Sequence, residues 1–310
     1  MRPQAALSTP PRRRRRAAAG VAAALAMAAG LAMAAGLAMA AGLAAAPALA
    51  APPADPLGSP MWDYRVEEWL GKDAVVRFDP RLKLVVPGIA EDQRAFPVLV
   101  DARALPEVRR ILILVDLNPI PVPLDFELDG AQAFIATRIK LDQRTPVRAL
   151  AQLADGSWAA AGTWVDAAGG GCSLPPVSRA RGDWADGLGE AQARAWALAD
   201  GSARLRVHLR HPMDTGFIEN VPLYHIEQVV LRGPDGAALG RLRLWASIAE
   251  DPVLTLMTRP QRAGAPLAVE AADSSGIRYA ALAPVPAVPA LAAAAPTAQL
   301  LQRVTFTSPR

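Results

Sequence analysis

A long series of short, β-branched segments, each bounded by proline, glycine or aspartate, decides the fold class of this chain. Such segments between turn-forming residues are typical of β-strands, and many of them at close spacing favour antiparallel sandwiches. The first group comprises residues 75–78, 82–86, 96–100, 110–115, 124–128, 133–140, 147–153 and 158–165. The second group comprises residues 205–209, 229–231, 241–245, 253–257, 267–271 and 276–282. We therefore expect an all-β protein with two β-sandwich domains, the second smaller than the first.

Between the two groups, residues 168–176 read Ala-Gly-Gly-Gly-Cys-Ser-Leu-Pro-Pro and contain Cys172, the only cysteine of the 310 residues. Glycine loses the most conformational entropy when it is fixed in a helix or strand, and proline stops regular structure. We therefore expect Gly169, Gly170 and Gly171 to form a flexible arm that leaves the Cys172 thiol exposed and mobile. The alternative is a small, buried apolar residue, because most free cysteines in proteins are of that kind.

Composition divides the chain into six segments. They are a signal peptide (1–50), a leader (51–73), the first sandwich ending at the cysteine (74–172), a Gly/Pro-rich linker (173–203), the second sandwich (204–283) and an Ala/Pro-rich tail (284–310). Amphipathic spacing predicts a short helix over residues 62–70. Residues 190–198 permit one helical segment within the linker.

The first fifty residues have the three parts of a secretory signal peptide. The arginine run 12–16 is followed by an alanine-rich apolar stretch, 17–46, and by the Ala-x-Ala site that ends at Ala50. Cleavage after Ala50 predicts an exported protein. An uncleaved membrane anchor is the alternative, because the apolar stretch is longer than usual for a signal peptide. The arginines leave both Sec and twin-arginine export open.

The positive charge of the chain belongs mostly to this signal. Removal of residues 1–50 leaves 27 basic residues against 29 acidic ones, a net charge of about −2. The mature chain has no dense basic run with interleaved aromatics, so nucleic-acid binding is not expected. In an oxidising compartment the lone thiol cannot form an internal disulfide. It is therefore expected to form an adduct, pair with another chain or be kept reduced by a partner.

The chain lacks the usual motifs of catalysis. A nucleophile elbow, a P-loop and a dinucleotide-binding glycine motif are all missing from the sequence. His208 and His211 are the nearest thing to a metal pair, but on a strand they point to opposite faces, so we expect no metal site. Arg179 or Arg181 in the linker could favour the thiolate form of the cysteine. We therefore expect no catalytic residue, and we take the protein to be a non-enzyme.

Several motifs, in order along the chain, resemble a fusion of the two subunits of the sulfur-oxidation carrier SoxYZ. The part that resembles SoxY contains residues 86–92 (Val-Pro-Gly-Ile-Ala-Glu-Asp), 96–100, 116–121 (Asp-Leu-Asn-Pro-Ile-Pro), 137–141 (Thr-Arg-Ile-Lys-Leu) and the glycine-cysteine segment. The part that resembles SoxZ contains residues 211–216 (His-Pro-Met-Asp-Thr-Gly), 222–226 and 273–276. The resemblance covers about residues 73–282.

This resemblance implies two immunoglobulin-like sandwiches and a periplasmic carrier in sulfur and thiosulfate oxidation. Cys172 matches the SoxY cysteine that bears covalent sulfur and visits successive enzymes. The implied partners are periplasmic redox enzymes, with no nucleic acid and no membrane after signal cleavage. The resemblance implies no tightly bound cofactor beyond the cysteine adduct.

The chain departs from SoxY directly after the cysteine. Ser173, Leu174 and Pro175 replace the trailing glycines, and the chain continues into the second domain. This form resembles the SoxYZ-like carriers associated with quinoprotein dehydrogenases. It implies a reactive loop of limited reach, held at both ends. The alternative function is an accessory protein of a PQQ-dependent alcohol dehydrogenase and its cytochrome, without sulfur cargo.

Overall fold

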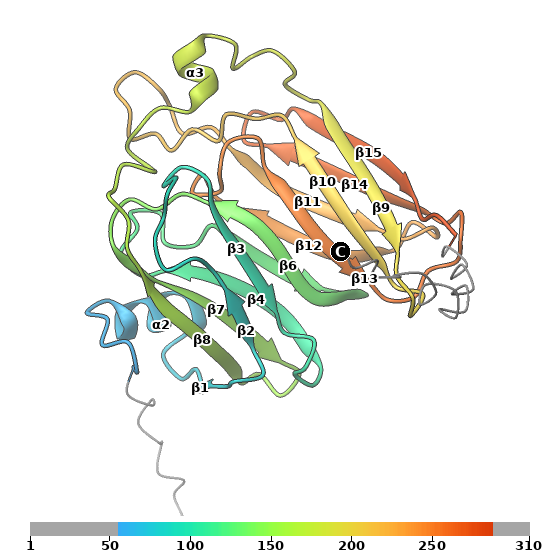
Figure 1. Cartoon of the computed structure of the whole chain (residues 1–310), viewed down its shortest axis with the longest axis horizontal. Coiled ribbons are helices and arrows are strands. Elements are labelled where there is room, and N and C mark those ends of the chain that lie inside the picture. Colours follow the sequence, from blue (N-terminus) through green and yellow to red (C-terminus); the bar gives the residue numbers. More distant parts are fainter. Residues whose placement is uncertain (1–54, 288–310) are drawn as a thin grey trace, which may run out of the picture. The chain divides into compact units, whose positions relative to one another are not determined.

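A computed structural model describes residues 55–287, which form two β-sheets and two short helices (Figure 1). The prediction of an all-β fold is confirmed. The helix expected over residues 62–70 is present as α2 (Trp62–Leu70). The predicted signal peptide, the start of the leader and most of the tail lie outside the described residues.

The first half of the chain supplies eight of the described strands. They are β1 (Val76–Phe78), β2 (Lys83–Val85), β3 (Phe96–Asp101), β4 (Val108–Val115), β5 (Leu124–Leu128), β6 (Ala131–Ile139), β7 (Thr145–Leu153) and β8 (Trp158–Val165). After α3 (Val177–Arg181), the second half supplies the others. They are β9 (Ala191–Ala197), β10 (Ala203–Leu209), β11 (Ile226–Arg232), β12 (Ala238–Leu244), β13 (Val253–Thr258), β14 (Pro266–Asp273) and β15 (Arg278–Pro284).

Both sheets run through both halves of the chain. The nine-stranded sheet has the order β1-β8-β7-β4-β5-β12-β11-β14-β15, and the six-stranded sheet has the order β2-β3-β6-β13-β10-β9. The halves join by antiparallel pairing of β5 with β12 and of β6 with β13. Strand pairing, in addition to the linker, therefore connects the two predicted sandwiches, and one hydrophobic core extends through both.

The helical segment predicted within the linker is wrong, because residues 191–197 form β9. This strand pairs with β10 over its whole length. Its sequence, Ala-Gln-Ala-Arg-Ala-Trp-Ala, places alanine at every second position, and Ala195 is buried while Arg194 is exposed. The period of two identifies a strand, although alanine also has the highest helix propensity.

Helix α2 covers part of the outer face of the nine-stranded sheet. Helix α2 contributes Trp62 to a second hydrophobic cluster on the nine-stranded sheet, together with Leu112 and Leu150. Arg148 fixes the start of this cover, because its buried guanidinium binds Asp55 at 2.7 Å and Asp116 at 2.9 Å. Among residues 55–287, no helix is long and apolar enough to cross a membrane.

Candidate functional site

Cys172 is fully buried, with 0% relative exposure. The prediction of an exposed thiol is therefore wrong for this conformation. The cysteine follows β8, and its segment is held by the end of β6 and by residues 211–216 of the second half. The site thus combines parts of both halves.

The glycines before the cysteine allow a close approach of backbones. The Gly171 N–H donates to the Leu141 carbonyl at 3.0 Å. A Cβ on Gly171 would lie 2.2 Å from the Gln93 carbonyl oxygen and 2.4 Å from that of Leu141, so any side chain here would collide with backbone. Gly169 has a φ of +104°, which strongly favours glycine. These glycines are required for packing in this state, and their role as a flexible arm stays a prediction.

Asp142 anchors the backbone on both sides of the thiol. Its Oδ1 accepts hydrogen bonds from the Cys172 N–H at 3.0 Å, the Ser173 N–H at 3.2 Å and the Ser173 hydroxyl at 2.7 Å. Ser173 is a position where the sequence departs from the trailing glycines of SoxY. The departure therefore supplies a hydrogen bond that holds the segment closed.

Asn118 orients this anchor and lies beside the sulfur. Its Oδ1 accepts the Asp142 N–H at 3.0 Å, and its Nδ2 donates to the Lys140 carbonyl at 2.7 Å. The same Nδ2 lies 4.0 Å from the Cys172 Sγ. An amide donor is thus directed at the sulfur, where it would stabilise a negatively charged sulfur species.

The second half closes the site from the other side. The Thr215 hydroxyl donates to the Cys172 carbonyl at 2.6 Å. The buried Lys140 ammonium donates to the carbonyls of Met213 and Ala246, both in the second half. The 211–216 motif and the 137–141 motif therefore meet at the cysteine.

His211 shapes the backbone of this closing loop. Its Nδ1 accepts the Met213 N–H at 2.8 Å, and Met213 has a φ of +54°, an unusual conformation for a residue with a side chain. Burial lowers the pKa of His211 to about 3, so the imidazole is neutral. His208 lies on β10 and takes no part in this loop. In the part of the chain that the structure describes, no cluster of three or more His, Cys, Asp or Glu side chains could hold a metal ion.

The electrostatics keep the thiol protonated. Burial raises the pKa of Cys172 to about 12; the charge of Lys140 opposes this shift, and that of Asp142 adds to it. Burial also lowers the pKa of Lys140 to about 8. At neutral pH the closed site therefore holds a thiol rather than the nucleophilic thiolate.

The two linker arginines considered from the sequence have other partners. Arg179 binds Asp214 at 2.5 Å and lies 3.5 Å from the centre of the Trp184 ring. Arg181 pairs with Asp183. Their predicted role beside the thiolate is wrong in this conformation, in which Lys140 is the cation that acts on Cys172.

The sequence interpretation missed the residues that build the site, namely Asn118, Lys140, Asp142, Met213 and Thr215. Four of them lie within motifs that carried the resemblance, at residues 116–121, 137–141 and 211–216. For Asn118, Lys140 and Asp142, the available signal was a polar side chain shortly after an apolar strand. Nothing in the sequence showed that they meet at one cysteine.

Comparison with known proteins assigns both halves. Residues 66–172 match the family described as Sulfur oxidation protein SoxY, and residues 192–283 match Sulphur oxidation protein SoxZ. No curated protein matches the chain. The solved sulfur carrier protein SoxY from Chlorobium limicola f thiosulfatophilum is 19% identical, with a TM-score of 0.31, and the match covers 34% of this chain and 96% of that one. A Bacteroides ovatus mixed-linkage glucan utilization protein, SGBP-B, is 13% identical, with a TM-score of 0.17, covering 67% and 46%.

Proposed function

We propose, from the premise that this chain fuses a SoxY domain with a SoxZ domain, that it is a periplasmic carrier of a sulfur intermediate bound covalently to Cys172. One observation carries the proposal: the only cysteine is the last residue of the SoxY match, and groups from both halves hold its backbone. In this role the protein is not an enzyme. It presents its cargo to periplasmic redox enzymes of the sulfur-oxidation type and needs no tightly bound cofactor.

The chemistry requires the segment to open. In the closed state the thiol is buried and protonated, so it cannot attack a sulfur donor. Release of the Asp142 and Thr215 hydrogen bonds exposes the sulfur and brings its pKa back toward 9.0, the ordinary value. The carrier therefore alternates between a closed state that protects the cysteine and an open state that reacts.

Loading of the open state is an exchange between sulfurs. The Cys172 thiol loses its proton to solvent, and the thiolate attacks one of the two central sulfurs of tetrathionate. A new S–S bond forms to Cys172, the central S–S bond of the donor breaks, and thiosulfate leaves with the electron pair. The exchange needs no external oxidant.

The experiment is intact-mass analysis of the protein isolated from the periplasm, followed by incubation of the reduced protein with tetrathionate. We expect an adduct on the wild-type chain that a thiol reductant removes, and none on Cys172→Ser. Because the chain has one cysteine, the adduct site is unambiguous. If the wild-type protein carries only unmodified thiol, both as isolated and after incubation with tetrathionate, the carrier function is refuted. The same measurement tests export, since a mature chain beginning at Ala51 is expected.

The burial of Cys172 favours a second candidate function, because a permanently closed thiol carries no cargo. In that case the protein is an accessory or assembly partner of a quinoprotein dehydrogenase and its cytochrome, as the Ser-Leu-Pro ending suggested. Co-purification with such a dehydrogenase that persists in Cys172→Ser, without any adduct on the wild-type protein, would favour this function over the carrier.

A further inference from the structure

The outer face of the six-stranded sheet carries a groove over the seam between the two halves. Strand register places Arg206, Thr255, Ala136, Leu99 and Val85 in one row across β10, β13, β6, β3 and β2. Thr255 and Ala136, at the seam, have small side chains, and the larger side chains of Arg206 and Leu99 stand on either side of them. Because neighbouring strands are about 4.8 Å apart, the row from Arg206 to Leu99 spans roughly 14 Å, enough for one extended chain. We call this hollow, of about 680 Å³, the seam groove.

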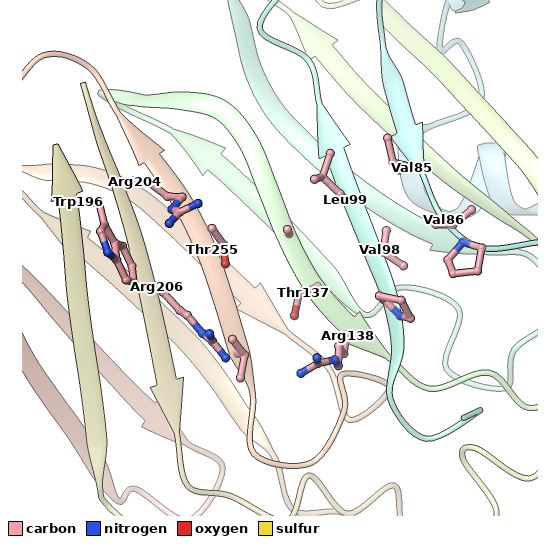
Figure 2. Close-up of a pocket in the computed structure, with 14 residues that line it drawn as sticks. Val85, Val86, Val98, Leu99, Thr137, Arg138, Trp196, Arg204, Arg206 and Thr255 are labelled. Carbon is pink, nitrogen blue, oxygen red and sulfur yellow. The ribbon is translucent and has the colours of Figure 1, made fainter. Parts of the chain in front are cut away.

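The seam groove has two different walls (Figure 2). On the β9–β10 side stand Arg204, Arg206 and Trp196, with the Arg204 guanidinium 4.7 Å from the centre of the Trp196 ring. On the β2–β3 side stand Val85 and Leu99. Val85 is 59% exposed, which is unusual for a valine on a strand. One wall is thus cationic and the other apolar.

The cations of the groove have no acidic partners among residues 55–287. Arg138, Arg204 and Arg206 form no ion pair there. On the other sheet, by contrast, Asp125 of β5 pairs with arginines of both neighbouring strands. Arg206 and Arg138 point toward one another across β13 (Figure 2). Like charges that face each other repel, and an anion between them would remove this repulsion.

No acidic side chain outside the described residues supplies that anion. Residues 51–54 and 288–310 are the part of the predicted mature chain that the structure does not describe, and neither segment contains an acidic side chain. The charged residues of the tail are Arg303 and Arg310. The charged side chains of the tail therefore repel the cationic wall and do not complement it.

We propose that the seam groove docks an extended segment of a partner protein in which acidic and apolar side chains alternate. In an extended chain successive side chains point to opposite sides. Such a segment, lying along the groove, directs its carboxylates to Arg204, Arg206 and Arg138 and its apolar side chains to Val85 and Leu99. The inference is independent of what Cys172 carries.

The position of the groove gives this docking a consequence. Beyond Arg138, a smaller hollow is lined by Asp92, Glu250 and Asp251. These carboxylates repel acidic side chains, so the acidic part of the docked segment extends no further than Arg138. Asp92 belongs to the same loop as Gln93, whose carbonyl lies against Gly171. A docked partner is therefore brought to the loop on which the cysteine segment rests.

The test uses the full mature chain and a fluorescein-labelled peptide of three Glu-Leu repeats, with binding followed by fluorescence anisotropy at low salt. The double variant Arg204→Glu/Arg206→Glu is expected to weaken binding at least tenfold. The matched control Arg77→Glu/Arg109→Glu reverses two exposed arginines on the other sheet that have no ion pair among the described residues, and it is expected to change binding less than twofold. Val85→Asp tests the apolar wall and should weaken binding severalfold.

Three outcomes overturn the proposal: equal binding of a Lys-Leu repeat peptide, equal weakening by both double variants, or no binding of the Glu-Leu peptide at all. Equal binding of oligoglutamate overturns the role of the apolar wall and leaves a general anion site. Thermal unfolding of each variant checks that it is folded. Cys172→Ser should bind the peptide like the wild type, so loss of the carrier function and loss of docking are distinguishable.

Discussion

Arg138 and Lys140 stand two residues apart at the end of β6, yet the charged group of Arg138 is exposed and that of Lys140 is buried. Arg138 is exposed in the seam groove and has no ion pair among residues 55–287. Lys140 is 4% exposed, and carbonyls of the second half accept its hydrogen bonds. The second half therefore covers one cation and leaves its neighbour open.

The difference follows from what the second half places opposite each position. Beside Arg138, β13 presents the small side chains of Val253 and Thr255, which leave space. Around Lys140, the chain presents the Met213 and Ala246 carbonyls, which bind the ammonium. The proposed partner recognition therefore lies in the seam groove at Arg138, and the protection of the thiol lies in the buried site at Lys140. Each of these roles can be tested separately.

The largest expected effect is on the pH dependence of stability at Lys140. Its pKa is about 8 in the folded protein and 10.5 ordinarily, although Cys172, Asp214 and Glu250 all act to raise it. Between these values the unfolded state binds more protons, so stability rises with pH. The destabilisation is complete below pH 8 and is lost by pH 10.5. A shift of this size corresponds to about 3 kcal/mol.

Lys140→Met is expected to remove this rise. Urea unfolding from pH 7.5 to 10.5 measures it, in the Cys172→Ser background so that the thiol does not titrate. The thiol has the opposite sign, since its folded pKa of about 12 exceeds the ordinary 9.0 and its contribution falls above pH 9. Arg138→Met is the control and should leave the pH profile unchanged. A profile that Lys140→Met does not alter would show that Lys140 is solvated, like Arg138.

The next effect concerns closure of the cysteine segment. Asp142→Ala removes the acceptor of three hydrogen bonds, each worth about 1 kcal/mol, and it also removes the negative charge that raises the pKa of Cys172. We expect the rate of Cys172 modification by an aromatic disulfide reagent at pH 7.5 to increase more than tenfold.

Asp155→Ala is the matched control for this experiment. Asp155 accepts hydrogen bonds from the N–H and hydroxyl of Ser157, the same two kinds of serine donor that Asp142 binds at Ser173, but within the β7–β8 turn and away from the site. It should leave the modification rate unchanged. Equal rates in Asp142→Ala and wild type would mean that other contacts hold the segment closed.

The sequence predicted the strands better than it predicted the site. Alternating and β-branched segments identified most strands, because burial of one or both faces imposes those patterns directly. The seam was not predictable, because pairing of β5 with β12 depends on which edges meet and leaves no local pattern. The glycines were ambiguous for a physical reason: a missing side chain permits both flexibility and close packing. For Gly171, only the positions of the Gln93 and Leu141 carbonyls show that the glycine serves close packing in this conformation.

The smallest expected effect is at Arg138, the open member of the pair. Arg138→Gln should change the free energy of unfolding by no more than about 0.5 kcal/mol, as is usual for exposed positions without buried partners. It should weaken binding of the Glu-Leu peptide about threefold, because one of three cations is lost, and the difference should vanish in 1 M salt, where the screening length is about 3 Å. Urea unfolding and anisotropy measure the two quantities. A loss of stability above 1 kcal/mol would mean that Arg138 supports the fold as Lys140 does, and the separation between an open recognition surface and a closed thiol site would then fail at this residue.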